Sequence, residues 1–87
     1  MAIDVYEVEN PEQYLFSIQD IEVISSELKR FKILTGTSID QFTNTYLHTH
    51  QLKILSKLIG GNKGAADIKK GLDEAIDNNR AVALLGD

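Results

Sequence analysis

The sequence predicts a mainly α-helical fold, an antiparallel bundle of about three amphipathic helices, and two observations favour it. Apolar residues recur at helical spacing in three segments of similar length, and short glycine-containing turns at Thr35-Gly36 and Gly60-Gly61-Asn62 separate these segments. Helices of this kind bury their apolar stripes against one another. The 87 residues suffice for one domain and leave no room for a second, so we expect a single helical domain over 1–87.

The first predicted helix begins at Asn10-Pro11-Glu12 and ends at Thr35-Gly36. Asparagine caps a helix, proline suits its first position, and glutamate is favourable at the positive end of the helix dipole. Glycine then supplies the left-handed cap that ends the helix. Between these signals, apolar residues recur every three or four positions: Tyr14, Ile18, Ile21, Ile24, Leu28, Phe31 and Leu34.

The N-terminal residues also fit an α+β fold, which we keep as the alternative. The strand-like alternation is carried by Tyr14, Phe16 and Ile18. Asp20 can then cap a shorter helix over 21–35. In this alternative, residues 2–19 form a β-hairpin that turns at Asn10-Pro11.

Two further segments have strand character. Residues 2–8 are rich in β-branched and aromatic side chains, which predicts a short strand. A single strand needs a partner, and the apolar segment 81–85 is the best candidate. That segment fits the last turns of a helix equally well, because its periodicity does not separate the two.

The second predicted helix spans about residues 39–59, and the third follows the turn at Gly60-Gly61-Asn62 and fades at Asn78-Asn79. Ser38 and Gln41 have the spacing of a capping box. The apolar side of the second helix consists of Ile39, Phe42, Tyr46, Leu47, Ile54, Leu55 and Leu58. Gly71 within the third helix costs roughly 1 kcal/mol relative to alanine unless close packing requires it.

Composition excludes several classes of protein. Cysteine is absent, so the chain has no disulfide, no thiolate metal site and no thiol nucleophile. No apolar run approaches the roughly 20 residues needed to cross a bilayer. The N-terminus lacks the basic and then apolar pattern of a secretory signal. We therefore expect a cytoplasmic protein that makes no membrane contact.

The formal net charge of −4 hides an uneven distribution. Residues 1–27 carry seven acids and no base, whereas residues 28–63 carry six bases and one acid. Ion pairing between neighbouring helices is one explanation of this distribution, and a charged surface that binds a partner is another. Nucleic-acid binding is not expected, because such proteins cluster Lys and Arg within a basic domain.

No constellation of residues predicts catalysis, a metal or a cofactor. On a helix, the imidazoles of His48 and His50 lie about 200° apart and cannot reach one ion. The segment 60–64 is glycine-rich but lacks the spacing of a phosphate-binding loop. The Gly-x-Ser-x-Gly elbow of hydrolases is also missing. The sequence therefore predicts a protein that is not an enzyme.

The segment His50-Gln51-Leu52-Lys53, followed by Ser56 and Gly60, is similar to the motif of histidine phosphotransfer domains. Those domains are helical bundles in which an exposed histidine accepts a phosphoryl group from a response regulator. The resemblance implies that His50 is the phospho-acceptor and that Lys53 supports the phosphoryl charge. Where the family usually has glycine, four positions after the histidine, this chain has Ile54.

A helix-turn-helix DNA-binding protein is a further alternative, because residues 28–31 and 36–38 precede a predicted helix. That helix continues over 39–59 without a glycine or proline for a second turn, and residues 39–52 contain no Lys or Arg. DNA-reading helices usually carry basic residues.

The sequence therefore favours a small acidic module that binds another protein, as an inhibitor, immunity-type protein, adaptor or regulator. A partner with a basic surface would suit the acidic N-terminal third, and the candidate contacts are Glu7, Glu12 and Glu22. The alternative is a self-associating structural or assembly subunit, a homo-oligomer with Leu84 and Leu85 at the contact.

Overall fold

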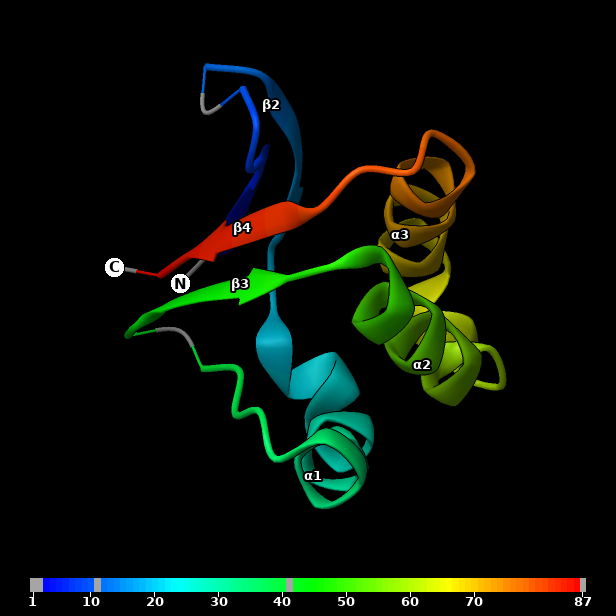
Figure 1. Ribbon diagram of the computed structural model, residues 1–87. Coiled ribbons are helices and arrows are strands. Elements are labelled where there is room, and N and C mark those ends of the chain that lie inside the picture. Colours follow the sequence, from blue (N-terminus) through cyan, green and yellow to red (C-terminus); the bar gives the residue numbers. More distant parts are fainter. Residues whose placement is uncertain (1–2, 11, 41, 87) are drawn as a thin grey trace.

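The protein has an α+β fold, as shown by a computed structural model that describes residues 3–10, 12–40 and 42–86. The helices are η1 (Ile21–Ile24), α1 (Ser25–Thr35), α2 (Thr49–Ile59), η2 (Lys63–Ala65) and α3 (Ala66–Asp77). The strands are β1 (Ile3–Glu7), β2 (Tyr14–Ile18), β3 (Asn44–Leu47) and β4 (Val82–Leu85). They form one antiparallel sheet in the order β2-β1-β4-β3 (Figure 1). The predicted mainly α bundle is therefore wrong, and the alternative α+β fold is confirmed.

The N-terminal segment forms the β-hairpin of the alternative prediction and not the first half of a long helix. Strand β1 pairs with β2 from Ile3 opposite Ile18 to Tyr6 opposite Tyr14. A strand brings Phe16 and Ile18 to the same face, where both pack against the core, whereas a helix would separate them. Pro11, the predicted first residue of the helix, lies outside the described residues.

The helical segment after the hairpin spans residues 21–35, as the alternative α+β fold predicted. The Asp20 carboxylate caps η1 by accepting a hydrogen bond from the Glu22 N–H at 3.0 Å. Helix α1 continues from η1 and ends at Gly36, which has a φ of 77°. Glycine adopts this left-handed conformation more readily than other residues do, so the predicted cap is confirmed.

The second helix begins ten residues later than predicted, at Thr49 and not at residue 39. The Asp40 carboxylate accepts hydrogen bonds from the backbone N–H groups of Phe42 at 2.8 Å and Thr43 at 3.0 Å, and this turn leads into β3. Residues 43–45 are poor helix formers, and pairing with β4 stabilises residues 44–47 as a strand.

The capping box of the second helix is also displaced along the chain. His48 and Gln51 form it, and the predicted cap at Ser38 lies in irregular backbone. Gln41, the predicted partner of Ser38, lies outside the described residues. The end of α2 at the Gly60-Gly61 turn and the extent of α3 agree with the prediction.

The C-terminal segment forms a central strand. Strand β4 lies between β1 and β3 and pairs with both (Figure 1). The strand predicted in residues 2–8 is therefore confirmed over Ile3–Glu7, and of the two interpretations left open for residues 81–85 the strand is correct. Pairing on both sides favours a strand over a helix, since each ladder satisfies backbone groups of residues 82–85.

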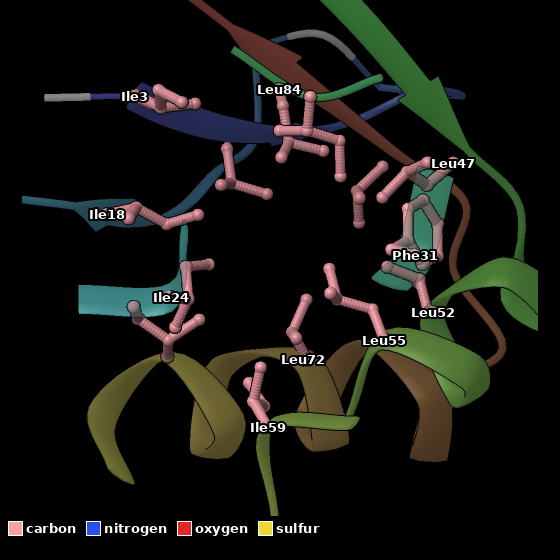
Figure 2. Packing of buried hydrophobic residues seen from close by; sticks show 14 of the residues in the cluster. Ile3, Ile18, Ile24, Phe31, Leu47, Leu52, Leu55, Ile59, Leu72 and Leu84 are labelled. Carbon is pink, nitrogen blue, oxygen red and sulfur yellow. The ribbon is translucent and has the colours of Figure 1, made fainter. Parts of the chain in front are cut away.

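One core fills the space between the sheet and the helices. Figure 2 shows side chains from the sheet and from the helices pointing toward each other across this space. The largest fully buried side chains of the sheet are Ile3, Val5, Ile18, Leu47, Val82 and Leu84. Those of the helices are Ile24, Phe31, Leu52, Leu55, Ile59 and Leu72. Because strand residues alternate between faces, the core uses one face of the sheet.

No described helix combines the length and the apolar character that crossing a bilayer requires.

Candidate functional site

The sheet face directed away from the core carries exposed aromatic side chains. Strand alternation and the register place eight side chains there, which we call the tyrosine face: Asp4, Tyr6, Tyr14, Ser17, Asn44, Tyr46, Ala83 and Leu85. Within residues 3–10, 12–40 and 42–86, the helices lie on the other side of the sheet (Figure 1).

The three tyrosines of the chain lie in a single row that crosses all four strands. Tyr14 pairs with Tyr6, Tyr6 with Ala83, and Ala83 with Tyr46. Four strands spaced by about 4.8 Å make this row roughly 14 Å long. Tyr46 is 63% exposed and Tyr14 is 49% exposed, whereas Tyr6 is half-buried between its neighbours. The row therefore offers aromatic surface at both edges of the sheet.

The β1–β2 half of the tyrosine face is held by direct contacts between its side chains. The rings of Tyr6 and Tyr14 meet edge to face, with centroids 5.6 Å apart and an interplanar angle of 70°. The Ser17 hydroxyl donates to an Asp4 carboxylate oxygen at 2.8 Å, so the Tyr14 hydroxyl is the donor in its 2.6 Å bond to Ser17. These contacts fix the orientation of Tyr14 and of Asp4.

Charge is divided between the two layers of the fold. Of the nine Lys and Arg residues, only Arg80 lies outside the helices. Arg80 precedes β4 and forms an ion pair with Glu7 at 3.8 Å. The four strands contain two acids, Asp4 and Glu7, and the β1–β2 turn adds the exposed Glu9 and Glu12. The tyrosine face therefore lies in a negatively charged part of the surface.

The tyrosine face has the chemistry of a surface for macromolecules. Tyrosine contributes a large, rigid contact area and a polar hydroxyl, and it is enriched where proteins bind one another. Three surface hollows of 430, 730 and 510 Å³ are lined by helix and loop residues and not by the strands. The arrangement of the sheet face thus suits a broad partner rather than an enclosed small ligand.

The structure separates the three predicted acidic contacts. Glu7 and Glu12 lie at the turn end of the β1–β2 hairpin, and Glu22 lies in η1 beyond its other end. Five residues of strand, roughly 16 Å, divide these positions. Glu7 is also half-buried beside Arg80, whereas Glu12 and Glu22 are exposed. The acidic residues therefore do not form one surface of their own.

The two predicted apolar contacts point to opposite sides of β4. Leu84 is 2% exposed and packs in the core, so it is not at the surface. Leu85 is half-buried on the tyrosine face, opposite Asp4 and Asn44.

The residues of the phosphotransfer motif lie in α2, in a fold that differs from the helical bundle implied by the resemblance. His50 and Lys53 are exposed, and Ile54 is half-buried against the core. The His48 ring stacks near the His50 ring with centroids 6.2 Å apart. Among the described residues, no group of three or more His, Asp or Glu side chains could hold a metal ion.

A polar cluster joins α2 to α3 on the helical side. Lys69 donates to an Asp73 carboxylate oxygen at 2.7 Å, and the buried Ser56 hydroxyl donates to the other oxygen of Asp73. These hydrogen bonds lower the pKa of Asp73 below its ordinary value of 3.8, and the hydrogen bond from Lys69 has the largest effect. The cluster therefore fastens the two helices together.

Sequence reasoning missed the tyrosine face because it assigned Tyr14 and Tyr46 to the apolar stripes of helices. The signal that could have found it is the alternation of side chains in β1 and β2. In β1 this alternation places Tyr6 on one face of the sheet and the buried Ile3 and Val5 on the other. In β3, four residues are too few for a period to be read.

Comparison of the chain with known protein families, with curated proteins and with solved structures finds no match. The site is therefore argued from its own residues.

Proposed function

We propose that this protein is a non-enzymatic binding module that holds another protein against its tyrosine face, and that the partner presents a basic surface. The observation that carries the proposal is the row Tyr14–Tyr6–Ala83–Tyr46 across an uncovered sheet face. A cytoplasmic location is part of the same proposal.

The charge of the sheet layer supports a basic partner. The Asp4 carboxylate accepts a hydrogen bond from Ser17 and, among the described residues, from no other group, so it retains capacity for a donor from outside. Guanidinium and ammonium groups also stack on the faces of exposed tyrosine rings. A basic segment can therefore use Tyr46, Tyr14 and Asp4 together, whereas the phosphates of a nucleic acid would be repelled by the acids.

The test uses tyrosine fluorescence, because every tyrosine of the chain lies in the row and tryptophan is absent. A lysine- and arginine-rich peptide of about ten residues and a glutamate peptide of equal length are titrated into the protein at low salt. We expect saturable change with the basic peptide only, weakening as salt is added. Amide chemical shifts of β1, β3 and β4 then locate the contact.

Phe42 provides a matched control, because its side chain is 65% exposed but lies outside the tyrosine face. We expect Tyr46→Ala and Asp4→Asn each to weaken peptide binding roughly tenfold, equivalent to about 1.4 kcal/mol, and Phe42→Ala to leave it unchanged. Equal weakening by Phe42→Ala and Tyr46→Ala, or binding of both peptides alike, would show that the tyrosine face is not the site.

A further inference from the structure

The outer edge of β3 is an open sheet edge. Strand β3 is last in the sheet order and pairs with β4 only. Outside the helices and the strand pairs, backbone hydrogen bonds join several described segments of the chain. None of these hydrogen bonds involves residues 44–47. One side of the β3 backbone thus has donors and acceptors available for another strand.

The sequence of β3 lacks the residue types that usually protect such an edge, although the strand is short, at four residues. Asn44-Thr45-Tyr46-Leu47 has no lysine, proline or charged residue, and its pairing with β4 is regular. The side chains that face inward, Thr45 and Leu47, are buried, so the strand is held firmly by its own core. This edge is therefore preformed for strand addition.

The opposite edge of the sheet is irregular. The register of β2 shifts between Val5 and Tyr6 of its partner strand, which marks a bulge. Bulges twist an edge and disfavour pairing with another strand. The Phe16 ring of β2 is also fixed against Gly71 of α3. Among the described residues, β3 is therefore the edge strand with regular pairing, and association through β3 alone favours a closed pair over an extending fibre.

We propose that two copies of this chain associate through β3, antiparallel about a two-fold axis perpendicular to the sheet, to form a continuous eight-stranded sheet. Each β3 would then supply the strand that the other lacks. The proposal is independent of a basic partner, since it uses the strand edge and not the tyrosine face.

The side-chain pattern of β3 agrees with such a pair. Antiparallel strands place residues of the same face opposite each other, so Tyr46 meets either Tyr46 or Asn44 of the second copy. The charged residues of the sheet layer do not oppose this contact, because β1, which carries Asp4 and Glu7, is separated from β3 by β4. The tyrosine rows of the two copies would join into one longer row.

The experiment measures the mass of the full chain by sedimentation equilibrium between about 20 μM and about 1 mM, a range suited to the weak pairing that a four-residue strand provides. We expect the wild type to pass from monomer to dimer over this range. Over the same range, amide hydrogen exchange at residues 44–47 should slow with concentration, while exchange in β2 should not change.

Tyr46→Lys and Tyr14→Lys form a matched pair of variants, since both residues are exposed tyrosines of the same face on opposite edge strands. Tyr46→Lys places like charges at the contact, so we expect a dissociation constant raised roughly tenfold or more. Tyr14→Lys should dimerise as the wild type does. Asn44→Lys, at an exposed position of β3, serves as a second edge variant, and circular dichroism checks the fold of each.

The outcomes separate this proposal from the proposed function. A wild type that is monomeric up to about 1 mM, or a dimer that Tyr46→Lys and Asn44→Lys leave intact, overturns the β3 pair without affecting peptide binding by the monomer. Loss of peptide binding in both tyrosine variants, with loss of the dimer in Tyr46→Lys only, supports both proposals.

Discussion

Gly71 of α3 lies so close to the Phe16 ring of β2 that a Cβ atom at position 71 would come within 2.7 Å of the ring carbon Cδ1. Carbon atoms do not approach one another this closely without displacement, so the glycine permits the contact between helix and strand. Since β2 is held to the rest of the sheet only by β1, this contact also fixes the hairpin against the helical layer.

Gly71→Ala is therefore expected to destabilise the fold although alanine favours helices. Alanine gains about 1 kcal/mol of helix propensity, and the forced displacement of Phe16 costs about 1–3 kcal/mol. We expect a net loss of up to about 2 kcal/mol in the free energy of unfolding, measured by urea denaturation.

The control for this prediction is a double-mutant cycle with Phe16→Leu, which removes the ring that alanine would meet. In that background Gly71→Ala should be neutral or stabilising, since only the helix propensity remains. An equal loss in both backgrounds would show that the contact with Phe16 is not the cause.

Asn62 connects the turn between α2 and α3 to the start of α1, and we expect Asn62→Asp to break this link. Its side-chain NH₂ donates to the Val23 carbonyl at 2.8 Å and to a Glu27 carboxylate oxygen at 2.7 Å, while its carbonyl oxygen accepts from the Gly64 N–H at 3.0 Å. Aspartate keeps the acceptor, loses both donors and repels Glu27.

The expected cost of Asn62→Asp is about 1–3 kcal/mol in the free energy of unfolding, read from thermal and urea denaturation. Adding Glu27→Gln should restore part of it, because a glutamine amide can donate to the new carboxylate. No recovery in the double variant would contradict a direct interaction between positions 62 and 27.

Asp73→Asn tests the polar cluster between α2 and α3 through its pH dependence. The pKa of Asp73 is lowered in the folded chain, first by its hydrogen bond with Lys69, so the ionised carboxylate stabilises the fold above the unfolded value of 3.8. That contribution is lost as pH falls through the folded pKa. Because the Asp73 side chain is 43% exposed, solvent screening limits it to roughly 0.5–1 kcal/mol.

We therefore expect Asp73→Asn to be less stable than the wild type at pH 7, and the difference to shrink as the pH falls below 3.8. Urea denaturation of both proteins at pH 7 and at acidic pH measures this difference in the free energy of unfolding. The effect should also decrease at high salt. A difference that is constant with pH would mean that the charge of Asp73 is not what stabilises the cluster.

Several local signals in the sequence predicted helix ends correctly, although the capping box predicted at Ser38 was wrong. Gly36 ends α1 because the backbone there has positive φ, and the glycine pair at 60–61 ends α2. The cap at Asp20 was recognised in the alternative prediction, because an N-cap depends on its own side chain and the next two residues.

The sheet could not be derived in the same way, since its pairing joins distant residues. Tyr46 and Leu47 continue a helical stripe in the sequence, yet they form a strand because Ala83 and Val82 lie beside them in β4. The tyrosine face follows only from this pairing, and neither Tyr14 nor Tyr46 shows in the sequence that it shares a row with Tyr6.

The cap of α2 can be improved, and His48 is the residue to change. His48 has the extended backbone of an N-cap, but its Nδ1 accepts from the Gln51 N–H at a long distance of 3.4 Å. Asparagine is among the best capping residues, and its shorter side chain carries the oxygen that this position requires.

We expect His48→Asn to raise the free energy of unfolding by about 0.5–1 kcal/mol in urea denaturation, and His48→Ala to lower it by a similar amount. Equal stability of the two variants would mean that the cap at His48 contributes nothing to α2.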